Sequence, residues 1–216
     1  MKKIILLTIV LTLSMFCLGA EATVVYSVYS FKQIAEKGDG PIELANGATG
    51  EEQLFVTVAD FCPGKVLFTF TNRGPYPSSI TGVYFDDGAL LGISSIDNSC
   101  QGVLFSRDAT PHNLPGGQNL LPPFETTDGF SADSDPPTQP NGVNPNEWLG
   151  ITFDLEPDNA YENVINNLNT TQLRIGIQVQ GFACGGSESF VNVPEPATIS
   201  ILSVGFSIAS LLRKRR

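Results

Sequence analysis

One stretch of the sequence decides the fold: Gln172-Leu173-Arg174-Ile175-Gly176-Ile177-Gln178-Val179-Gln180. Apolar and polar residues alternate in it without a break, so all the apolar side chains lie on one side of an extended chain. This period of two predicts a β-strand that is buried on one face. We expect Ile175 and Ile177 to point together into a core, and Arg174 and Gln178 to face solvent.

The apolar face of this strand needs a second layer to cover it. Burying each of its four apolar side chains contributes about 1.5–3 kcal/mol, so together they rival the net stability of a domain. A helix with Asp158 as its N-cap is predicted just before the strand, and its apolar stripe consists of Tyr161, Val164, Ile165 and Leu168. A single helix cannot cover a sheet of six or more strands, so we expect a second sheet.

Further strands are predicted on both sides of this segment. They fall at 23–29, 54–60, 66–71, 80–85, 89–96, 101–106, 148–155 and 188–192. The Pro63-Gly64 turn predicts a hairpin of the second and third of these, and Asp86-Asp87-Gly88 predicts another hairpin. Residues 46–50 are expected to be a loop, as are 107–146, where eight prolines disfavour regular pairing. The predicted fold is all-β, a β-sandwich of the jelly-roll type with one short helix.

The N-terminal residues have the pattern of a cleavable signal peptide. Two lysines precede an apolar run from Ile4 to Leu18, and the small residues Ala20 and Ala22 follow at the positions that signal peptidase reads. We expect cleavage after Ala22, with cleavage after Ala20 as the alternative. Residues 1–22 are therefore assigned to the leader and 23–192 to the exported domain.

The segment 193–216 has three parts in a fixed order. Val193-Pro194-Glu195-Pro196-Ala197-Thr198 comes first, a short apolar helix is predicted from Ile199 to Leu212, and a basic stop follows at Arg213, Lys214, Arg215 and Arg216. The apolar part is short beside the ~20 residues of a durable membrane helix, and the basic residues favour the cytoplasmic side. This arrangement predicts a temporary membrane anchor.

These three parts resemble the PEP-CTERM sorting signal of Gram-negative and related bacteria. The resemblance implies recognition by an exosortase, a membrane-embedded enzyme similar to cysteine transpeptidases, which would process the chain near Pro194, Glu195 and Pro196. The segments 69–75, 79–88 and 174–182 also resemble a recurrent ectodomain of PEP-CTERM proteins, over about 130 residues from Thr69. That ectodomain has no assigned activity, so the resemblance implies no ligand.

Charge and cysteine content restrict the partners of the exported domain. Residues 23–192 contain six Lys and Arg against twenty Asp and Glu, a net charge of −14 that disfavours nucleic acid. Removal of the leader leaves Cys62, Cys100 and Cys184, an odd number, so we expect one disulfide and one free thiol. Cys62 and Cys100 are the favoured pair because both lie at ends of neighbouring predicted strands. No C-x-x-C spacing supports a metal site.

Catalytic groups are hard to assemble from this sequence. His112, the only histidine, lies in a turn-rich stretch without a nucleophile motif, and is interpreted as an exposed loop residue. A glycosidase would need two facing carboxylates. The candidates near strands have simpler roles in turns, strand ends and a helix cap: Asp86, Asp87, Asp154 and Glu156. The chain is therefore predicted not to be an enzyme, with a glycoside-active enzyme as the less favoured alternative.

Two ligand classes remain as alternatives. Hard oxygen ligands for Ca²⁺ gather in the long loop, although an acidic solvent-facing loop is the favoured interpretation and no cofactor is predicted: Asp128, Asp133, Asp135, Asn141, Asn144 and Asn146. Aromatic residues that could stack on sugars are Tyr76, Tyr84, Phe124, Phe130 and Trp148. Tyr84 and Trp148 are interpreted as core residues, so Phe124 and Phe130 are the predicted exposed platform of a carbohydrate-binding module.

The sequence thus predicts a non-catalytic protein exported across the inner membrane. We expect it at the cell surface or in the extracellular matrix, held transiently in the membrane by the segment 193–216. Signal peptidase and exosortase are the predicted partners inside the envelope. An extracellular polysaccharide is the candidate partner outside.

Overall fold

The computed structural model describes residues 25–35, 40–86 and 90–194. Their strands are β1 (Tyr26–Gln33), β2 (Leu54–Cys62), β3 (Lys65–Asn72), β4 (Ser79–Asp86), β5 (Leu90–Asp97), β6 (Phe105–Arg107), β7 (Ser131–Ser134), β8 (Trp148–Leu155), β9 (Arg174–Gln180) and β10 (Ser187–Asn192). The helices are α1 (Pro41–Gln53), α2 (Thr138–Asn141) and α3 (Tyr161–Asn169), with a 3-10 turn at Gly117–Asn119. The signal-peptide residues and most of the sorting segment lie outside the described ranges.

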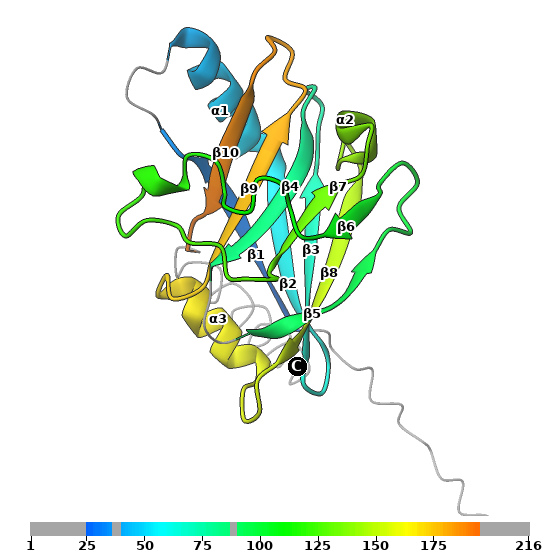
Figure 1. Cartoon of the computed structure of the whole chain (residues 1–216), viewed down its shortest axis with the longest axis vertical. Coiled ribbons are helices and arrows are strands. Elements are labelled where there is room, and N and C mark those ends of the chain that lie inside the picture. The colour runs from blue at the N-terminus through cyan, green and yellow to red at the C-terminus, as the bar shows by residue number, and fades with distance from the viewer. Residues whose placement is uncertain (1–24, 36–39, 87–89, 195–216) are drawn as a thin grey trace, which may run out of the picture.

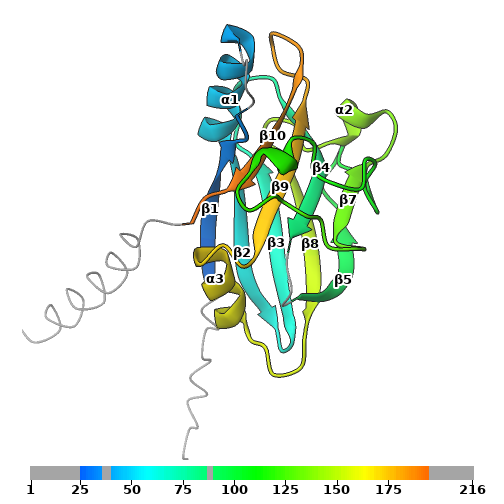
Figure 2. The same ribbon diagram turned by 60° about the vertical axis from the view of Figure 1, so that its left-hand side comes forward.

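All ten strands belong to one antiparallel sheet, in the order β5-β8-β3-β2-β1-β10-β9-β4-β7-β6 (Figure 1). Strand β1 pairs with β2 through Tyr26 to Ser30 and with β10 through Phe31 to Gln33. The sheet bends at this shared strand, and in Figure 2 β9 and β4 pass in front of β2, β3 and β8. The all-β prediction is confirmed. The two layers that were expected as separate sheets are two halves of a single curled sheet.

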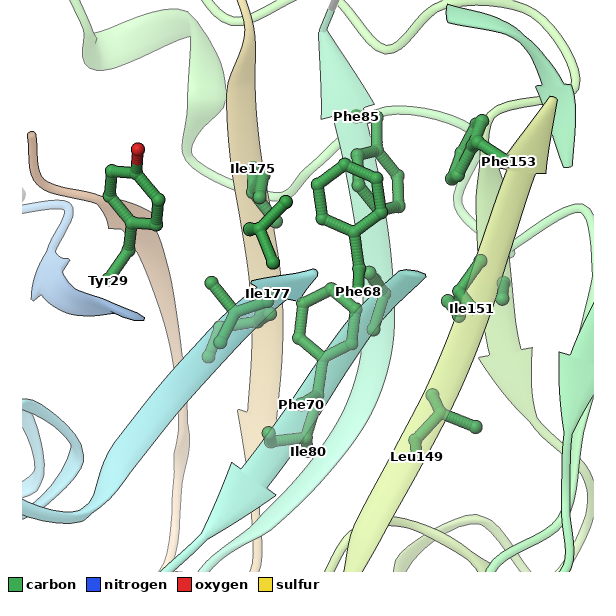
Figure 3. Close-up of a cluster of buried hydrophobic side chains, with 14 of the residues drawn as sticks. Tyr29, Phe68, Phe70, Ile80, Phe85, Leu149, Ile151, Phe153, Ile175 and Ile177 are labelled. Carbon is green, nitrogen blue, oxygen red and sulfur yellow. The ribbon is translucent and has the colours of Figure 1, made fainter. Parts of the chain in front are cut away.

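Aromatic rings from the two halves meet at the centre of the core. The Phe85 ring on β4 lies 5.0 Å from that of Phe68 on β3 and 4.6 Å from that of Phe153 on β8, both in edge-to-face geometry. Ile175 and Ile177 of β9 join the same cluster, fully buried as the alternation predicts (Figure 3). Edge-to-face pairs add about 0.5–1.5 kcal/mol each beyond the burial of their surface, so this contact holds the two halves together.

Side chains bridge the two edge strands of the curled sheet. The Asn98 side chain donates to the carbonyl of Phe105 (3.0 Å) and accepts from its N–H (2.9 Å), as a neighbouring strand would. Arg107 of β6 donates to the carbonyl of Ser94 on β5 (3.0 Å). These bonds occupy backbone groups that an open edge would leave free for another chain.

Helix α3 covers part of the core, as predicted. Tyr161, Val164 and Leu168 are buried in the main core, and Ile165 packs against it partly buried. The predicted N-cap is wrong: Ala160 occupies that position, and Asp158 lies in a turn with φ of 70°.

Helix α1 was not predicted, and the expected loop at 46–50 lies inside it. Proline stands at the first helical position, where its missing N–H is no loss. Gly50 looks like a turn residue but serves close packing, because a Cβ there would lie 2.2 Å from Cζ of Phe190 on β10. The glycines that suggested a loop let the helix approach the sheet.

The predicted hairpin of residues 80–85 and 89–96 is also wrong. Both strands exist, but β4 pairs with β9 and β7, whereas β5 pairs with β8 on the other half of the sheet. Strands β4 and β5, although consecutive in the chain, therefore lie in different halves of the sheet. The hairpin of β2 and β3 and the strands β8, β9 and β10 agree with the prediction.

A third layer lies on the outer face of the second half. The segment 108–130 crosses β4 and β9 and forms a small second core of Ile34, Tyr84, Ala109, Leu114 and Phe124. Gly176 on β9 makes room for it, since a Cβ there would lie 2.5 Å from Cδ2 of Leu114. Arg174 was expected to face solvent; this segment covers it instead, and its guanidinium donates to the carbonyl of Pro122 (2.7 Å) and pairs with Asp86.

We predict that Phe85→Ala lowers the free energy of unfolding by about 3–5 kcal/mol, because it empties the contact between the two halves. Leu91→Ala on the edge strand β5 is the control, since Leu91 is 59% exposed and its loss should cost less than about 0.5 kcal/mol. Urea unfolding followed by circular dichroism measures both. Equal losses for the two variants would contradict this account of the core.

Candidate functional site

A groove of about 720 Å³ lies on the outer face of β2, β3 and β8. Its central row is set by strand register: Thr57 of β2 is opposite Thr69 of β3, Thr69 is opposite Gly150 of β8, and Gly150 is opposite Asp97 of β5. Residues in register share a face of the sheet, so these four positions line up across four strands. The groove is lined by Thr57, Leu67, Thr69, Thr71, Asn72, Arg73, Asp97, Asn146, Glu147, Trp148 and Gly150.

Gly150 forms the floor of the groove, and the indole of Trp148 stands beside it. A Cβ on Gly150 would lie 3.2 Å from Cβ of Asp97 and 3.6 Å from Cζ3 of Trp148, so a larger residue would raise the floor of the groove against both side chains. Trp148 is partly exposed and shares the outer face of β8 with Gly150, Thr152 and Asp154, whereas Leu149, Ile151 and Phe153 point into the core. The interpretation of Trp148 as a core residue is therefore wrong.

A buried polar network fixes the end of β3 beside the groove. The Gln53 side chain donates to Oδ1 of Asn72 (3.0 Å) and to Oγ of Ser78 (2.6 Å), and Asn72 donates to the carbonyl of Ser78 (2.9 Å). Asn72 also holds the segment before β8, since its carbonyl accepts from the N–H of Asn146 (2.7 Å). Fully paired buried groups of this kind are costly to disturb, so the rim of the groove is held in one conformation.

The rim carries charges of both signs. The guanidinium of Arg73 lies 3.9 Å from the ring centroid of Phe55, in cation–π geometry. Glu147 accepts hydrogen bonds from the N–H (2.8 Å) and side-chain amide (3.0 Å) of Asn144, and Asp97 accepts from the N–H of Ser99 (2.9 Å). Both carboxylates therefore accept hydrogen bonds from residues two or three positions away in their own loops.

Three polar groups in the groove have no hydrogen-bond partner within the described part of the chain. They are the hydroxyls of Thr57 and Thr69 and the indole N–H of Trp148. Each is only partly exposed. A ligand in the groove would lie beside three residues whose polar groups the described part of the protein does not use.

The residues predicted as a sugar platform are not exposed. Phe130 lies in the main core with its ring 5.3 Å from that of Phe153, and Phe124 lies in the second core. Tyr84 is buried as predicted, and Tyr76 is exposed. Trp148 alternates with the inward residues Leu149, Ile151 and Phe153 of β8, and this alternation is the sequence signal that would have identified the groove.

The candidate catalytic groups do not converge. Asp86 pairs with Arg174 on the second half of the sheet, and Asp154 pairs with Lys65 on the first. Glu156 is partly buried past the end of β8, and Asp87 lies outside the described residues. His112 is exposed in its loop, as predicted.

The calcium candidates are dispersed or already engaged. Asp128 is exposed, and the Asn141 side chain donates to the carbonyl of Asp135 (2.9 Å). Asn144 donates to Glu147 (3.0 Å), and Asn146 is exposed at the rim of the groove. Within residues 25–35, 40–86 and 90–194, no group of three His, Cys, Asp or Glu side chains could hold a metal ion.

Cys62, Cys100 and Cys184 are free thiols in the structure, so the expected Cys62–Cys100 bridge is not formed. Cys62 pairs with Lys65, which is opposite Asp154, whereas Cys100 follows Asp97, which is opposite Gly150. The two cysteines thus lie toward opposite ends of β8, whose positions Gly150 and Asp154 are roughly 14 Å apart along the strand at ~3.4 Å per residue. A disulfide needs Cα atoms within about 7 Å.

No family model, curated protein or solved structure matches this chain. None of the helices in the described ranges is long and apolar enough to cross a membrane. The described ranges end at Pro194. They therefore do not include the predicted signal-cleavage residues Ala20 and Ala22, the motif residues Glu195 and Pro196, or the basic stop.

Two aspartates are predicted to affect stability with opposite pH dependence. Burial raises the pKa of Asp133, so its favourable contribution is complete below the unfolded value of about 3.9 and is lost as pH rises through the folded value. The hydrogen bond from Lys65 lowers the pKa of Asp154, so its contribution is present above about pH 3.9 and is lost as pH falls through the folded value.

As pH rises from about 4 to 7, the stability of Asp133→Asn relative to the wild type should therefore increase. The stability of Asp154→Asn should stay constant and below that of the wild type over this window, and should approach it only as pH falls below about 4. Urea unfolding at a series of pH values measures both differences. Parallel trends for the two variants would contradict these assignments.

Proposed function

We propose that the protein is an exported, non-catalytic component of the bacterial cell surface or extracellular matrix. In this proposal signal peptidase removes residues 1–22, and an exosortase in the inner membrane processes the segment 193–216. The observation that carries the proposal is the ordered sequence Pro194-Glu195-Pro196, short apolar run and basic stop. A run this short suits a temporary anchor better than a lasting one.

The end of the described fold supports accessibility of the sorting motif. The N–H of Val193 donates to the carbonyl of Ser30 (3.0 Å), so the chain is held to β1 up to that residue. Pro194 is exposed and has no N–H with which to continue the pairing. Sheet pairing thus stops where the motif begins, and an enzyme could reach the motif without opening the sheet.

The remainder of the domain supports a binding or structural role. The two facing halves of the curled sheet are compatible with the jelly-roll-like sandwich inferred for the ectodomain. Asp86 and Asp154 are each paired with a basic residue, which leaves neither free for acid–base chemistry in a shared cleft.

Replacing Pro194, Glu195 and Pro196 by alanine should leave an unprocessed precursor in the membrane fraction of the producing cells. Intact mass spectrometry of the wild type should show loss of both the leader and the residues after the motif. Pro63→Ala, in the exposed turn between β2 and β3, is the control and should be processed normally. Recovery of the Ile199–Leu212 peptide from mature surface protein would overturn the proposal.

A further inference from the structure

We propose that the groove on the outer face of β2, β3 and β8 binds a neutral polysaccharide chain, with Trp148 as the stacking platform. The inference rests on the geometry of the groove and does not depend on how the protein is sorted. The proposed platform is thus different from the predicted one, because Phe124 and Phe130 are buried in the two cores.

The shape of the groove suits an extended ligand. Its volume of about 720 Å³ lies within the range of ligand-binding sites, roughly 300–1,000 Å³. The row Thr57-Thr69-Gly150-Asp97 runs across the strands, and neighbouring strands are ~4.8 Å apart, so the row spans roughly 14 Å. The missing side chain at Gly150 gives depth where the indole ring stands.

The chemistry of the lining matches a sugar. A pyranose ring has an apolar C–H face and hydroxyls around its edge. The indole offers a flat apolar surface together with an N–H donor. The hydroxyls of Thr57 and Thr69 are each donor and acceptor, and no partner within the described residues occupies them.

A peptide strand is a poorer fit to this surface. Strand β3 pairs on both sides, with β2 and β8, and β8 pairs with β3 and β5. Their backbone N–H and C=O groups are therefore already used, and a peptide could not add as a further strand. Recognition in the groove has to come from side chains alone.

Charge argues against an acidic polymer. The groove lining contains Asp97 and Glu147 against one cation, Arg73, whose guanidinium already lies over Phe55. The whole chain carries a net charge of −10. A polyanion would be repelled by the carboxylates of the groove and by the net charge of the chain, whereas a neutral polysaccharide would not.

The protein contains a single tryptophan, so its fluorescence reports on this groove alone. The mature protein from producing cells is titrated with glucomannan, dextran and the neutral polysaccharide fraction of the same cells. Polygalacturonate serves as the anionic comparison. A neutral polysaccharide should shift the emission to the blue and protect Trp148 from acrylamide quenching, and polygalacturonate should do neither.

Variants separate binding from folding. Thr57→Val with Thr69→Val keeps both β-branched shapes, removes only the hydroxyls, and should weaken binding roughly tenfold in the fluorescence titration. In affinity electrophoresis Trp148→Ala should weaken retention by roughly tenfold or more. Tyr76→Ala is the control, because Tyr76 is 51% exposed and does not line the groove.

Three outcomes would overturn the proposal. One is the absence of any effect from all the neutral polysaccharides. Another is unchanged retention of a folded Trp148→Ala protein, with folding checked by its urea midpoint. The third is protection of Trp148 that depends on protein concentration without polysaccharide, which would assign the groove to a second copy of this chain.

Discussion

Strand β1 pairs with β2 through its first residues and with β10 through its last, and the rest of the structure depends on this divided pairing. It turns a ten-stranded sheet back on itself, so that one set of side chains from each half forms a shared core. The Phe85, Phe68 and Phe153 rings meet there because the bend places β4 opposite β3 and β8. Without the bend, the apolar face of neither half would have a partner layer.

The same bend determines what the outer faces can do. Side chains alternate along a strand, so inward Leu149, Ile151 and Phe153 require outward Trp148, Gly150 and Thr152. On the second half, the segment 108–130 covers the outer face with its own small core. On the first half, the outer face keeps a groove with partly exposed polar groups, and this difference makes it the candidate binding surface.

Local sequence patterns correctly predicted the elements that are determined by residues close together in the sequence. The alternation in β9, the hydrophobic stripe of α3 and the Pro63-Gly64 turn all correspond to observed structure. Pairing between β5 and β8 could not be predicted from the turn after β4, because it depends on contacts distant in sequence. Helix α1 was missed since the reason for Gly50, the Phe190 ring against it, lies 140 residues away. The outward position of Trp148 could have been predicted from the sequence, because Trp148 is on the same side of the strand as Thr152 and Asp154.

Nuclear Overhauser contacts across β1 test the central claim most directly. The account predicts cross-strand backbone contacts from Tyr29 to Val56 of β2 and, in the same molecule, from Lys32 to Val191 of β10. Both sets should be present in the mature protein at full intensity. Contacts from β1 to only one of these neighbours would show two separate sheets and would contradict the account.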